Sequence, residues 1–238
     1  MEYHNSVLLS ESIDALSIKK DGVYVDVTFG GGGHSREILK RLGSKGMLLA
    51  FDQDPDAIRN KIEDSRFILI EENFRYISRF LKFYGIKKVD GVLADLGVSS
   101  HQFDEAERGF SIRFDGELDM RMNQSSKNSA KKIINTYPED KLADILFMYG
   151  ELRNARSIAK TIVEEREIKN IDTSFQLRSV LQRYLPKAKE HKILAQIFQA
   201  IRIEVNEELD VLKEFLIQTP ALLKPEGRLS VISYHSLE

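Results

Sequence analysis

The sequence predicts an α/β protein with a doubly wound, Rossmann-like parallel sheet and an inserted helical subdomain. Two observations support this class. Over the first 95 residues, short apolar stretches typical of strands alternate with amphipathic stretches typical of helices, a pattern that favours a parallel sheet. The first strand-like stretch is also followed directly by a run of glycines and a helix-like segment, the unit with which such sheets hold nucleotides.

The first of these elements covers residues 24–42. Residues 24–27 are apolar and β-branched, which predicts a buried strand, and Gly30–Gly33 follow it. Residues 35–42 place their apolar side chains on one face of a helix. Glycines at this turn would allow a ligand to approach the backbone, and the helix N-terminus would add free N–H donors. A plain flexible loop is the alternative interpretation.

The glycine run does not match the dinucleotide fingerprint, because Ser35 or Arg36 stands where the third glycine is required. This argues against a nicotinamide-dependent dehydrogenase. An acid, Asp52, nevertheless follows the next strand-like stretch, where it can hold the two ribose hydroxyls of an adenosine. An adenosine carrying a flexible chain fits these features, and S-adenosylmethionine answers that description.

The remaining elements follow in order. Strands are expected at 46–51, 67–71, 89–95 and 229–233, with a tight turn at 222–228 leading into the last. Helices are expected after Asp54-Pro55, at 75–84 and at 207–219. Residues 103–126 are expected to be irregular, and 127–206 read as consecutive helices. We therefore expect a methyltransferase domain of residues 1–104 and 206–238, and an inserted substrate-recognition subdomain of residues 105–205.

The composition is that of an ordinary globular protein, with 42% hydrophobic and 30% charged residues. The absence of cysteine excludes disulfides and thiolate chemistry and favours the cytoplasm. No apolar run is long enough to span a bilayer, and the first residues do not resemble a signal peptide. The chain stops directly after the last predicted strand, so we expect it to be shortened.

The net charge of −2 gives no general sign of nucleic-acid binding. The segment 121–200, however, holds 15 basic and 9 acidic residues. Most of these charges are expected to form a solvated helix face. A cluster at Arg121, Lys127, Lys131 and Lys132 keeps a phosphate-binding role open.

The candidate site lies at the carboxyl ends of the strands, where open α/β sheets bind ligands. Four loops meet there: Gly30–His34, Asp52, Asn73-Phe74 and Asp95–Gln102. Asp95 either accepts a hydrogen bond from a ligand or caps the next turn, and Phe74 either stacks on an adenine or packs into the core. His34 is expected to order the glycine turn. The histidines are too scattered for a metal site, so no metal is expected.

Seven motifs, in order along almost the whole chain, resemble the MraW/RsmH family. They are His4-Asn-Ser-Val-Leu-Leu9, Asp26-Val-Thr-Phe-Gly-Gly-Gly-Gly-His-Ser35, Phe51-Asp-Gln-Asp54, Ala94-Asp-Leu-Gly-Val-Ser-Ser100, Leu118-Asp-Met-Arg-Met122, Phe198-Gln-Ala-Ile-Arg-Ile-Glu-Val-Asn206 and Ser233-Tyr-His-Ser-Leu-Glu238.

The resemblance implies transfer of a methyl group from S-adenosylmethionine to the exocyclic N4 of a cytidine in small-subunit (16S) ribosomal RNA. It places the cofactor-contacting positions at Gly32, Gly33, His34, Asp52, Phe74, Asp95 and Gln102, to which the glycine turn adds Gly30. Family members continue beyond the last motif, and this puts full activity in question. A non-catalytic RNA- or S-adenosylmethionine-binding protein and a DNA amino-methyltransferase are the alternatives.

The chemistry of the target suggests the remaining roles. The lone pair of the cytosine amine is delocalised, so a hydrogen-bond acceptor must draw on its N–H while the methyl is held in line. Asp95 and the following loop, including Ser99, are candidate acceptors, and His235 is a candidate for holding the base or its proton. Candidate RNA contacts are Arg121, Lys131, Lys132, Arg202 and Tyr234. The expected partner is ribosomal RNA, whether the protein is a monomer or a dimer.

Overall fold

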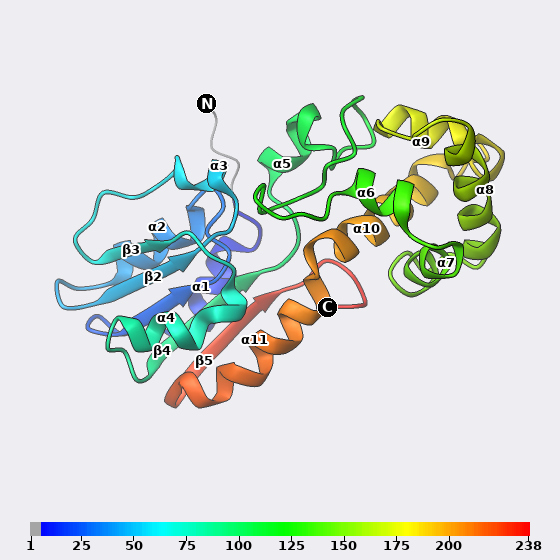
Figure 1. Ribbon diagram of the computed structural model, residues 1–238. Helices are drawn as coiled ribbons and strands as arrows, with labels where there is room; N and C mark the ends of the chain where they lie inside the picture. The colour runs from blue at the N-terminus through cyan, green and yellow to red at the C-terminus, as the bar shows by residue number, and fades with distance from the viewer. Residues whose placement is uncertain (1–5) are drawn as a thin grey trace. The chain divides into compact units, whose positions relative to one another are not determined.

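The computed structural model describes residues 6–238, which divide into two compact units (Figure 1). Unit 1 comprises residues 1–99 and 209–238, and unit 2 comprises residues 100–208. The boundaries expected from the sequence, after residue 104 and before residue 206, lie a few residues from these. The first family-like motif begins at His4 and Asn5, which lie outside the described residues.

Unit 1 contains a five-stranded sheet with the order β3-β2-β1-β4-β5. Every neighbouring pair is parallel, so the predicted doubly wound class is confirmed. The chain order of the strands reverses between β1 and β4, which marks the carboxyl ends of these strands as the place where such sheets bind ligands. The strands are β1 (Val23–Asp26), β2 (Met47–Phe51), β3 (Phe67–Ile70), β4 (Val89–Asp95) and β5 (Leu223–Ile232).

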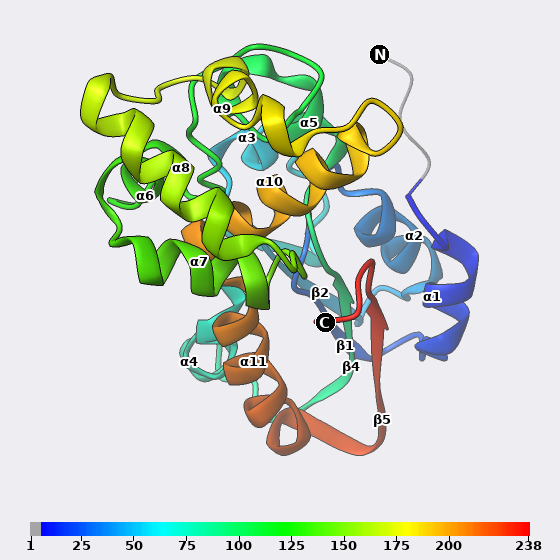
Figure 2. The ribbon, with the colours of Figure 1, turned by 90° about the vertical axis from the view of Figure 1, so that its right-hand side faces the viewer.

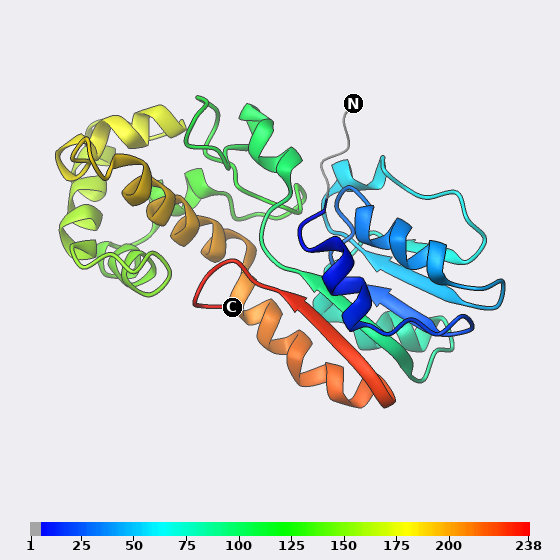
Figure 3. The same cartoon turned by 180° about the vertical axis from the view of Figure 1, so that it is seen from behind.

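Helices cover both faces of this sheet. Alternate residues of a strand point to opposite faces, so Leu49 and Phe51 join a core with α4 and α11, whereas Leu48 and Ala50 join a core with α1 and α2. Figure 1 shows α4 and α11 in front of the sheet, and Figure 3 shows α1 and α2 from behind. The helices are α1 (Leu9–Ala15), α2 (Gly33–Arg41), α3 (Pro55–Ile58), the short 3₁₀ helix η1 (Phe74–Tyr76), α4 (Ile77–Phe83) and α11 (Glu208–Leu222).

The helix expected after Asp54-Pro55 is present as α3, and Asp54 caps it by accepting the amide of Asp56 at 3.0 Å. One expectation about unit 1 needs correction. The last strand begins at Leu223 and not at Leu229, because Leu223 already pairs with Val89. Pairing then resumes at residue 228, so the expected turn is a bulge inside β5.

Unit 2 is helical and has its own apolar core. Its longest helix, α10, packs against α6 and α7, and α7 packs against α8 (Figure 2). The expected irregular stretch 103–126 contains the end of one short helix and a 3₁₀ turn before its chain becomes irregular. The elements are α5 (Ser100–Asp104), η2 (Ala106–Arg108), α6 (Ala130–Thr136), α7 (Glu139–Met148), α8 (Ala155–Ile168), α9 (Ser174–Val180), η3 (Gln182–Tyr184) and α10 (Glu190–Asn206). None of the helices in residues 6–238 is long and apolar enough to cross a membrane.

Candidate functional site

The glycine turn after β1 is held in one conformation by its own hydrogen bonds. Gly30 and Gly32 have φ angles of 50° and 75°, a region that favours glycine. The Gly30 carbonyl accepts from the amide side chain of Asn60 at 3.1 Å, and the Gly31 carbonyl accepts from Arg36 at 2.6 Å. A Cβ at Gly30 or Gly31 would meet no protein atom within 4 Å. The turn therefore presents a bare backbone to open space, followed by the free amides of the first turn of α2.

Asp52, at the carboxyl end of β2, is tied directly to this turn. Its Oδ2 accepts the Gly30 amide at 2.7 Å, and its Oδ1 accepts the Asp54 amide at 2.9 Å. Each oxygen keeps a second lone pair for a further donor. Burial raises the pKa of Asp52 from an ordinary 3.8 to about 6. The carboxylate is thus fixed in place and poorly solvated, which are the properties needed to hold a pair of hydroxyl groups.

A second carboxylate, Asp26, lies at the end of β1 and was not singled out as a site residue from the sequence. It is fully buried, and its Oδ2 accepts the Ser35 hydroxyl at 2.6 Å. Its Oδ1 accepts the amide of Thr28 at 3.1 Å, and burial raises its pKa. Because Thr28 Oγ1 in turn accepts the amide of Asp95 at 2.7 Å, Asp26 links the ends of β1 and β4 to the start of α2.

His34, in the first turn of α2, is almost fully buried. Its Nε2 lies 3.1 Å from the carbonyl oxygen of Val7, and its Nδ1 lies 3.9 Å from Asp95 Oδ2. The imidazole therefore connects the N-terminal segment, the glycine turn and the end of β4. This geometry is consistent with the ordering role expected for His34, and its contact with a cofactor stays a prediction.

Asp95 ends β4, and its side chain is 22% exposed. Its Oδ1 accepts the hydroxyl of Tyr234, which follows β5, at 2.9 Å. Burial raises the pKa of Asp95. Burial and the neighbouring carboxylate also raise the pKa of the Tyr234 phenol, so this hydroxyl remains a neutral donor at physiological pH. The two residues form a hydrogen-bonded acid and phenol at the carboxyl ends of the strands, the edge of unit 1 that we call the mouth.

The last residues of the chain bring another histidine toward this end of β5. His235 Nε2 lies 3.2 Å from Glu238 Oε1, and Glu238 Oε2 accepts the amide of Tyr234 at 2.8 Å. Ser99 is partly buried at the end of the loop after β4. Catalytic roles for His235 and Ser99 stay predictions.

Phe74 packs into the core and also keeps part of its surface exposed. Its ring contacts Phe215 edge-on, with centroids 5.4 Å apart. The neighbouring Asn73 donates its side-chain amide to Gln53 at 2.9 Å, which joins the loops after β2 and β3. Gln102 is buried in α5 and belongs to unit 2, so its cofactor contact also stays a prediction.

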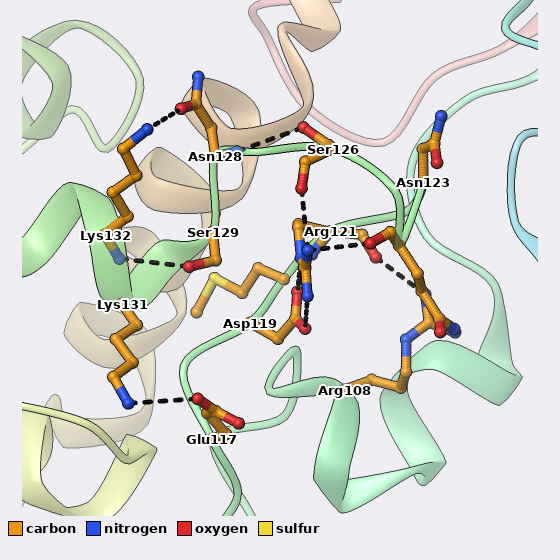
Figure 4. Close-up of polar contacts among 12 residues, drawn as sticks. Arg108, Glu117, Asp119, Arg121, Asn123, Ser126, Asn128, Ser129, Lys131 and Lys132 are labelled. Carbon is orange, nitrogen blue, oxygen red and sulfur yellow. Dashed lines mark hydrogen bonds and ion pairs between the residues drawn. The ribbon is translucent and has the colours of Figure 1, made fainter.

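The four cations predicted to contact RNA differ in how far their charges are neutralised, and Figure 4 shows three of them, Arg121, Lys131 and Lys132. Arg121 forms a two-pronged pair with Asp119 at 2.7 and 2.8 Å, and its remaining nitrogen donates to two backbone carbonyls. Lys131 lies 3.3 Å from Glu117 and 3.2 Å from Asp172. Lys132 donates to the neutral side chain of Asn128 at 3.0 Å. Of the three in Figure 4, Lys132 alone has no carboxylate partner among the described residues.

The fourth cation, Arg202, is largely buried in α10. Its guanidinium makes two parallel hydrogen bonds to Glu208, at 2.8 and 2.9 Å. Three of the four predicted phosphate ligands are therefore engaged by carboxylates of their own unit. Among residues 6–238, no three metal-binding side chains gather at one place.

The parallel sheet, the bare glycine turn and the acid after β2 together define unit 1 as the cofactor domain of an S-adenosylmethionine-dependent methyltransferase. More specifically, the chain belongs to the MraW methylase family, whose profile matches residues 1–238. The family resemblance found in the sequence is thereby confirmed.

The chain is similar to several individual proteins. The chain is 68% identical to a ribosomal RNA small subunit methyltransferase H of Christiangramia forsetii, over 100% of this chain and 79% of that protein. It is 63% identical to the protein of the same name from Flavobacterium johnsoniae, over the same shares of the two chains. A solved rRNA methylase from Streptococcus thermophilus is 19% identical, with a TM-score of 0.31 over 41% of this chain and 57% of that chain.

Proposed function

We propose that the protein transfers a methyl group from S-adenosylmethionine to the exocyclic N4 of a cytidine in small-subunit ribosomal RNA. The observation that carries this proposal is the bond between Asp52 and the Gly30 amide, because it sets a ribose-binding acid beside a backbone surface with open space in front of it. Family membership and the names of the curated relatives support the choice of substrate. The small ribosomal subunit is the proposed partner, and the cytoplasm is the proposed place of action.

The residues of the mouth suit an adenosine with a charged chain. Asp52 has two free lone pairs for the ribose hydroxyls, and the bare turn at Gly30 and Gly31 leaves room for the ligand. Gly32, Gly33 and His34 supply the first helical turn, whose amides suit a carboxylate. Phe74 keeps an exposed part of its ring for an adenine, and Gln102 completes the proposed cofactor set. S-adenosylmethionine, once bound, supplies a methyl group already activated by a sulfonium.

Asp95 is the proposed acceptor for the amino group of the cytosine. Its partly exposed carboxylate is placed at the mouth, while the Tyr234 hydroxyl and the backbone bond to Thr28 fix its orientation. Accepting an N–H draws the amine lone pair out of conjugation and makes the nitrogen a better nucleophile. The burial that raises the pKa of Asp95 also makes this carboxylate a stronger base.

The target base must leave its stack to reach Asp95, and this is easiest in single-stranded RNA. Ser99 and His235 lie on the segments that follow β4 and β5. We propose that they hold the base or its departing proton. Tyr234, 55% exposed, is proposed to contact the RNA as well as Asp95.

The test is transfer of a tritiated methyl group from S-adenosylmethionine to small ribosomal subunits that lack the modification. We expect label in the small-subunit RNA, released on nuclease digestion as N4-methylated cytidine, and no label in duplex DNA of matched length. The Asp52→Ala variant is the internal control, since it should lose transfer together with cofactor binding. Label in DNA alone, or binding of S-adenosylmethionine without any transfer, would overturn the proposal.

A further inference from the structure

The charges of unit 2 are divided unevenly along its sequence. Residues 173–203 hold six basic residues and one acidic residue, Glu190. The rest of unit 2 holds 12 basic and 17 acidic residues. The segment between α9 and the first turn of α10 therefore stands out as a local concentration of positive charge, although the unit as a whole has no net charge.

The single acid in this stretch is already occupied. Glu190 accepts hydrogen bonds from Arg178 of α9, at distances of 2.6 and 2.8 Å. Four other cations lie in residues 183–192, which we call the basic segment. All four are exposed, and no ion pair involves any of them within residues 6–238. They are Arg183, Lys187, Lys189 and Lys192.

The backbone that carries these cations is well anchored. Leu181 and Leu185 are buried with relative exposures of 0% and 3%. The Tyr184 hydroxyl lies 2.8 Å from both the Ser157 carbonyl and Thr161 Oγ1 of α8. The turn before α10 is closed by a 2.8 Å bond from the Lys189 amide to the Pro186 carbonyl. The basic segment thus has an anchored backbone that carries exposed charged side chains, and it lies between α9 and α10 in Figure 2.

An exposed aromatic ring lies on the helix that this loop follows. Phe175 of α9 is 42% exposed. The guanidinium of Arg178, one turn further along, lies 6.0 Å from its ring centre. Because Arg178 also bonds to Glu190 at the start of α10, Phe175 is connected to the basic segment through a single residue. Exposed rings beside arginines are the surfaces on which unpaired bases stack.

The cluster expected from the sequence to hold phosphates differs from this surface. Arg121 is neutralised by Asp119 and Lys131 by Glu117 (Figure 4). Asp172 is a second partner of Lys131. Moving such a cation onto a phosphate would break an ion pair that already exists, which lowers the net electrostatic gain. The cations of the basic segment have no partner of this kind to lose. They release counterions when they meet a phosphate chain.

We propose that the basic segment, together with Phe175, binds single-stranded RNA on one side of the target cytidine. The four cations contact successive phosphates, and the Phe175 ring stacks on a base. This inference rests on the proposed function, because it assigns the RNA of that reaction to a particular surface of unit 2.

The test compares two fourfold variants that remove the same charge. The first is Arg183→Gln, Lys187→Gln, Lys189→Gln and Lys192→Gln. The control changes exposed cations on and beside α8, a helix that also carries Glu164, Glu165 and Glu167. These changes are Arg153→Gln, Arg156→Gln, Lys160→Gln and Lys169→Gln. The probe is a labelled single-stranded RNA copied from the small-subunit sequence, and its affinity is measured as a function of salt concentration.

For the first variant we expect the slope of log affinity against log salt to fall by about 0.7 for each lost phosphate contact. The control should keep the slope of the unaltered protein. Phe175→Ala should weaken binding roughly 5- to 100-fold without changing the slope, because stacking releases no counterions. Thermal unfolding and affinity for S-adenosylmethionine should be unchanged in all three variants.

Two results would overturn the inference and leave the proposed function intact. One is an equal slope in both fourfold variants while the unaltered protein binds and methylates RNA. The other is an unaltered affinity for RNA with a lost affinity for vesicles of anionic phospholipid, which would assign the surface to a membrane. Failure of the unaltered protein to methylate small-subunit RNA, with slopes that differ as expected, would contradict the proposed function and leave an RNA-binding surface.

Discussion

The mouth of unit 1 and the basic segment of unit 2 carry their charges in opposite ways. At the mouth, Asp26, Asp52 and Asp95 are partly or fully withdrawn from water, and each is hydrogen-bonded to a residue of a neighbouring strand end or helix. In the basic segment, the charged tips extend into solvent from an anchored loop, with no carboxylate partner in the described chain. In the mouth, hydrogen bonds fix the charged groups themselves. In the basic segment, only the chain that carries the charged groups is fixed.

This difference indicates what each region is able to recognise. Buried carboxylates with spare lone pairs select donors at fixed positions, such as the hydroxyls of a ribose. Exposed cations recognise a line of negative charge, and they do so with little regard for the exact position of each charge. Substitutions in the mouth should therefore produce large and specific losses. Substitutions of single surface cations should produce small and graded ones.

The largest effect is expected for Asp95→Asn, which keeps the shape and the bond to Tyr234 but removes the charge. An acceptor of a proton in the reaction typically contributes about 10²- to 10⁴-fold in rate. We therefore expect single-turnover methylation of small-subunit RNA to slow by about that factor, with unchanged thermal unfolding. The companion variant Tyr234→Phe should slow methylation less, since it only frees the Asp95 carboxylate to rotate. A rate for Asp95→Asn within threefold of the unaltered protein would remove Asp95 from the chemistry.

The next effect concerns Asp52→Ala. A hydrogen bond to a charged group is worth about 1.5–3 kcal/mol, so loss of one ribose contact should weaken binding of S-adenosylmethionine roughly 10- to 150-fold. Calorimetric titration measures this directly. Asp56→Ala is the matched control, because this acid lies on α3, next to the same loop, and has no proposed role in binding. An affinity that is equal in the two variants would rule out the ribose role.

The pH dependence of cofactor binding is expected to be a smaller effect than the loss caused by Asp52→Ala. It is set by ionisation of the Asp52 carboxyl. Its pKa of about 6 in the folded protein exceeds the ordinary 3.8, and only the ionised form accepts two hydroxyl donors. Affinity should therefore fall by about tenfold for each pH unit below about 6. The Asp52→Asn variant cannot ionise and should show a flat profile in this range.

The stability of the folded protein should depend on the Asp52 carboxyl with the opposite pH trend to that of cofactor affinity. The folded protein holds the Asp52 proton more tightly than the unfolded chain does, so the stabilisation is full below pH 3.8 and is lost as pH rises through about 6. In the absence of ligand, the unaltered protein should lose stability relative to Asp52→Asn across this interval. An identical pH profile of chemical denaturation in the two proteins would show that the carboxyl is not buried in solution.

The strand ends of unit 1 could be predicted from the sequence because apolar runs, glycines and terminal acids mark them locally. Asp52 and Asp95 were found in this way. Asp26 was not, although it also ends an apolar strand, because its role depends on Ser35 and Thr28 meeting it after folding. The start of β5 was misplaced for a related reason. The Pro225 and Gly227 pair signals a turn, and only the pairing of Leu223 with Val89 makes that turn a bulge.

The pairing of the charges in unit 2 could not be predicted from the sequence. Arg121, Lys131 and Lys132 lie close together along the chain, but their sequence positions do not show which carboxylates pair with them. The acids that neutralise two of them are Asp119, Glu117 and Asp172, of which the last is remote in sequence and is brought close by the bridge between Glu117 and Thr173. Which cations remain free is a property of the tertiary structure, and no local pattern encodes it.

Lys131 and Lys132 therefore offer the finest comparison, since they are adjacent in sequence and differ in pairing. The Lys131 ammonium lies within 3.3 Å of both Glu117 and Asp172. The Lys132 ammonium donates to the neutral side chain of Asn128 (Figure 4) and has no carboxylate partner among the described residues. If RNA reaches this helix, Lys132→Gln should lower the salt slope of RNA binding by about 0.7, the share of one phosphate. Lys131→Gln should leave the slope unchanged and lower the melting temperature slightly, because it strips two carboxylates of their partner. Equal slopes for the two variants would mean that pairing within the unit does not decide which cations bind RNA, and the distinction between a neutralised and a free basic surface would then fail.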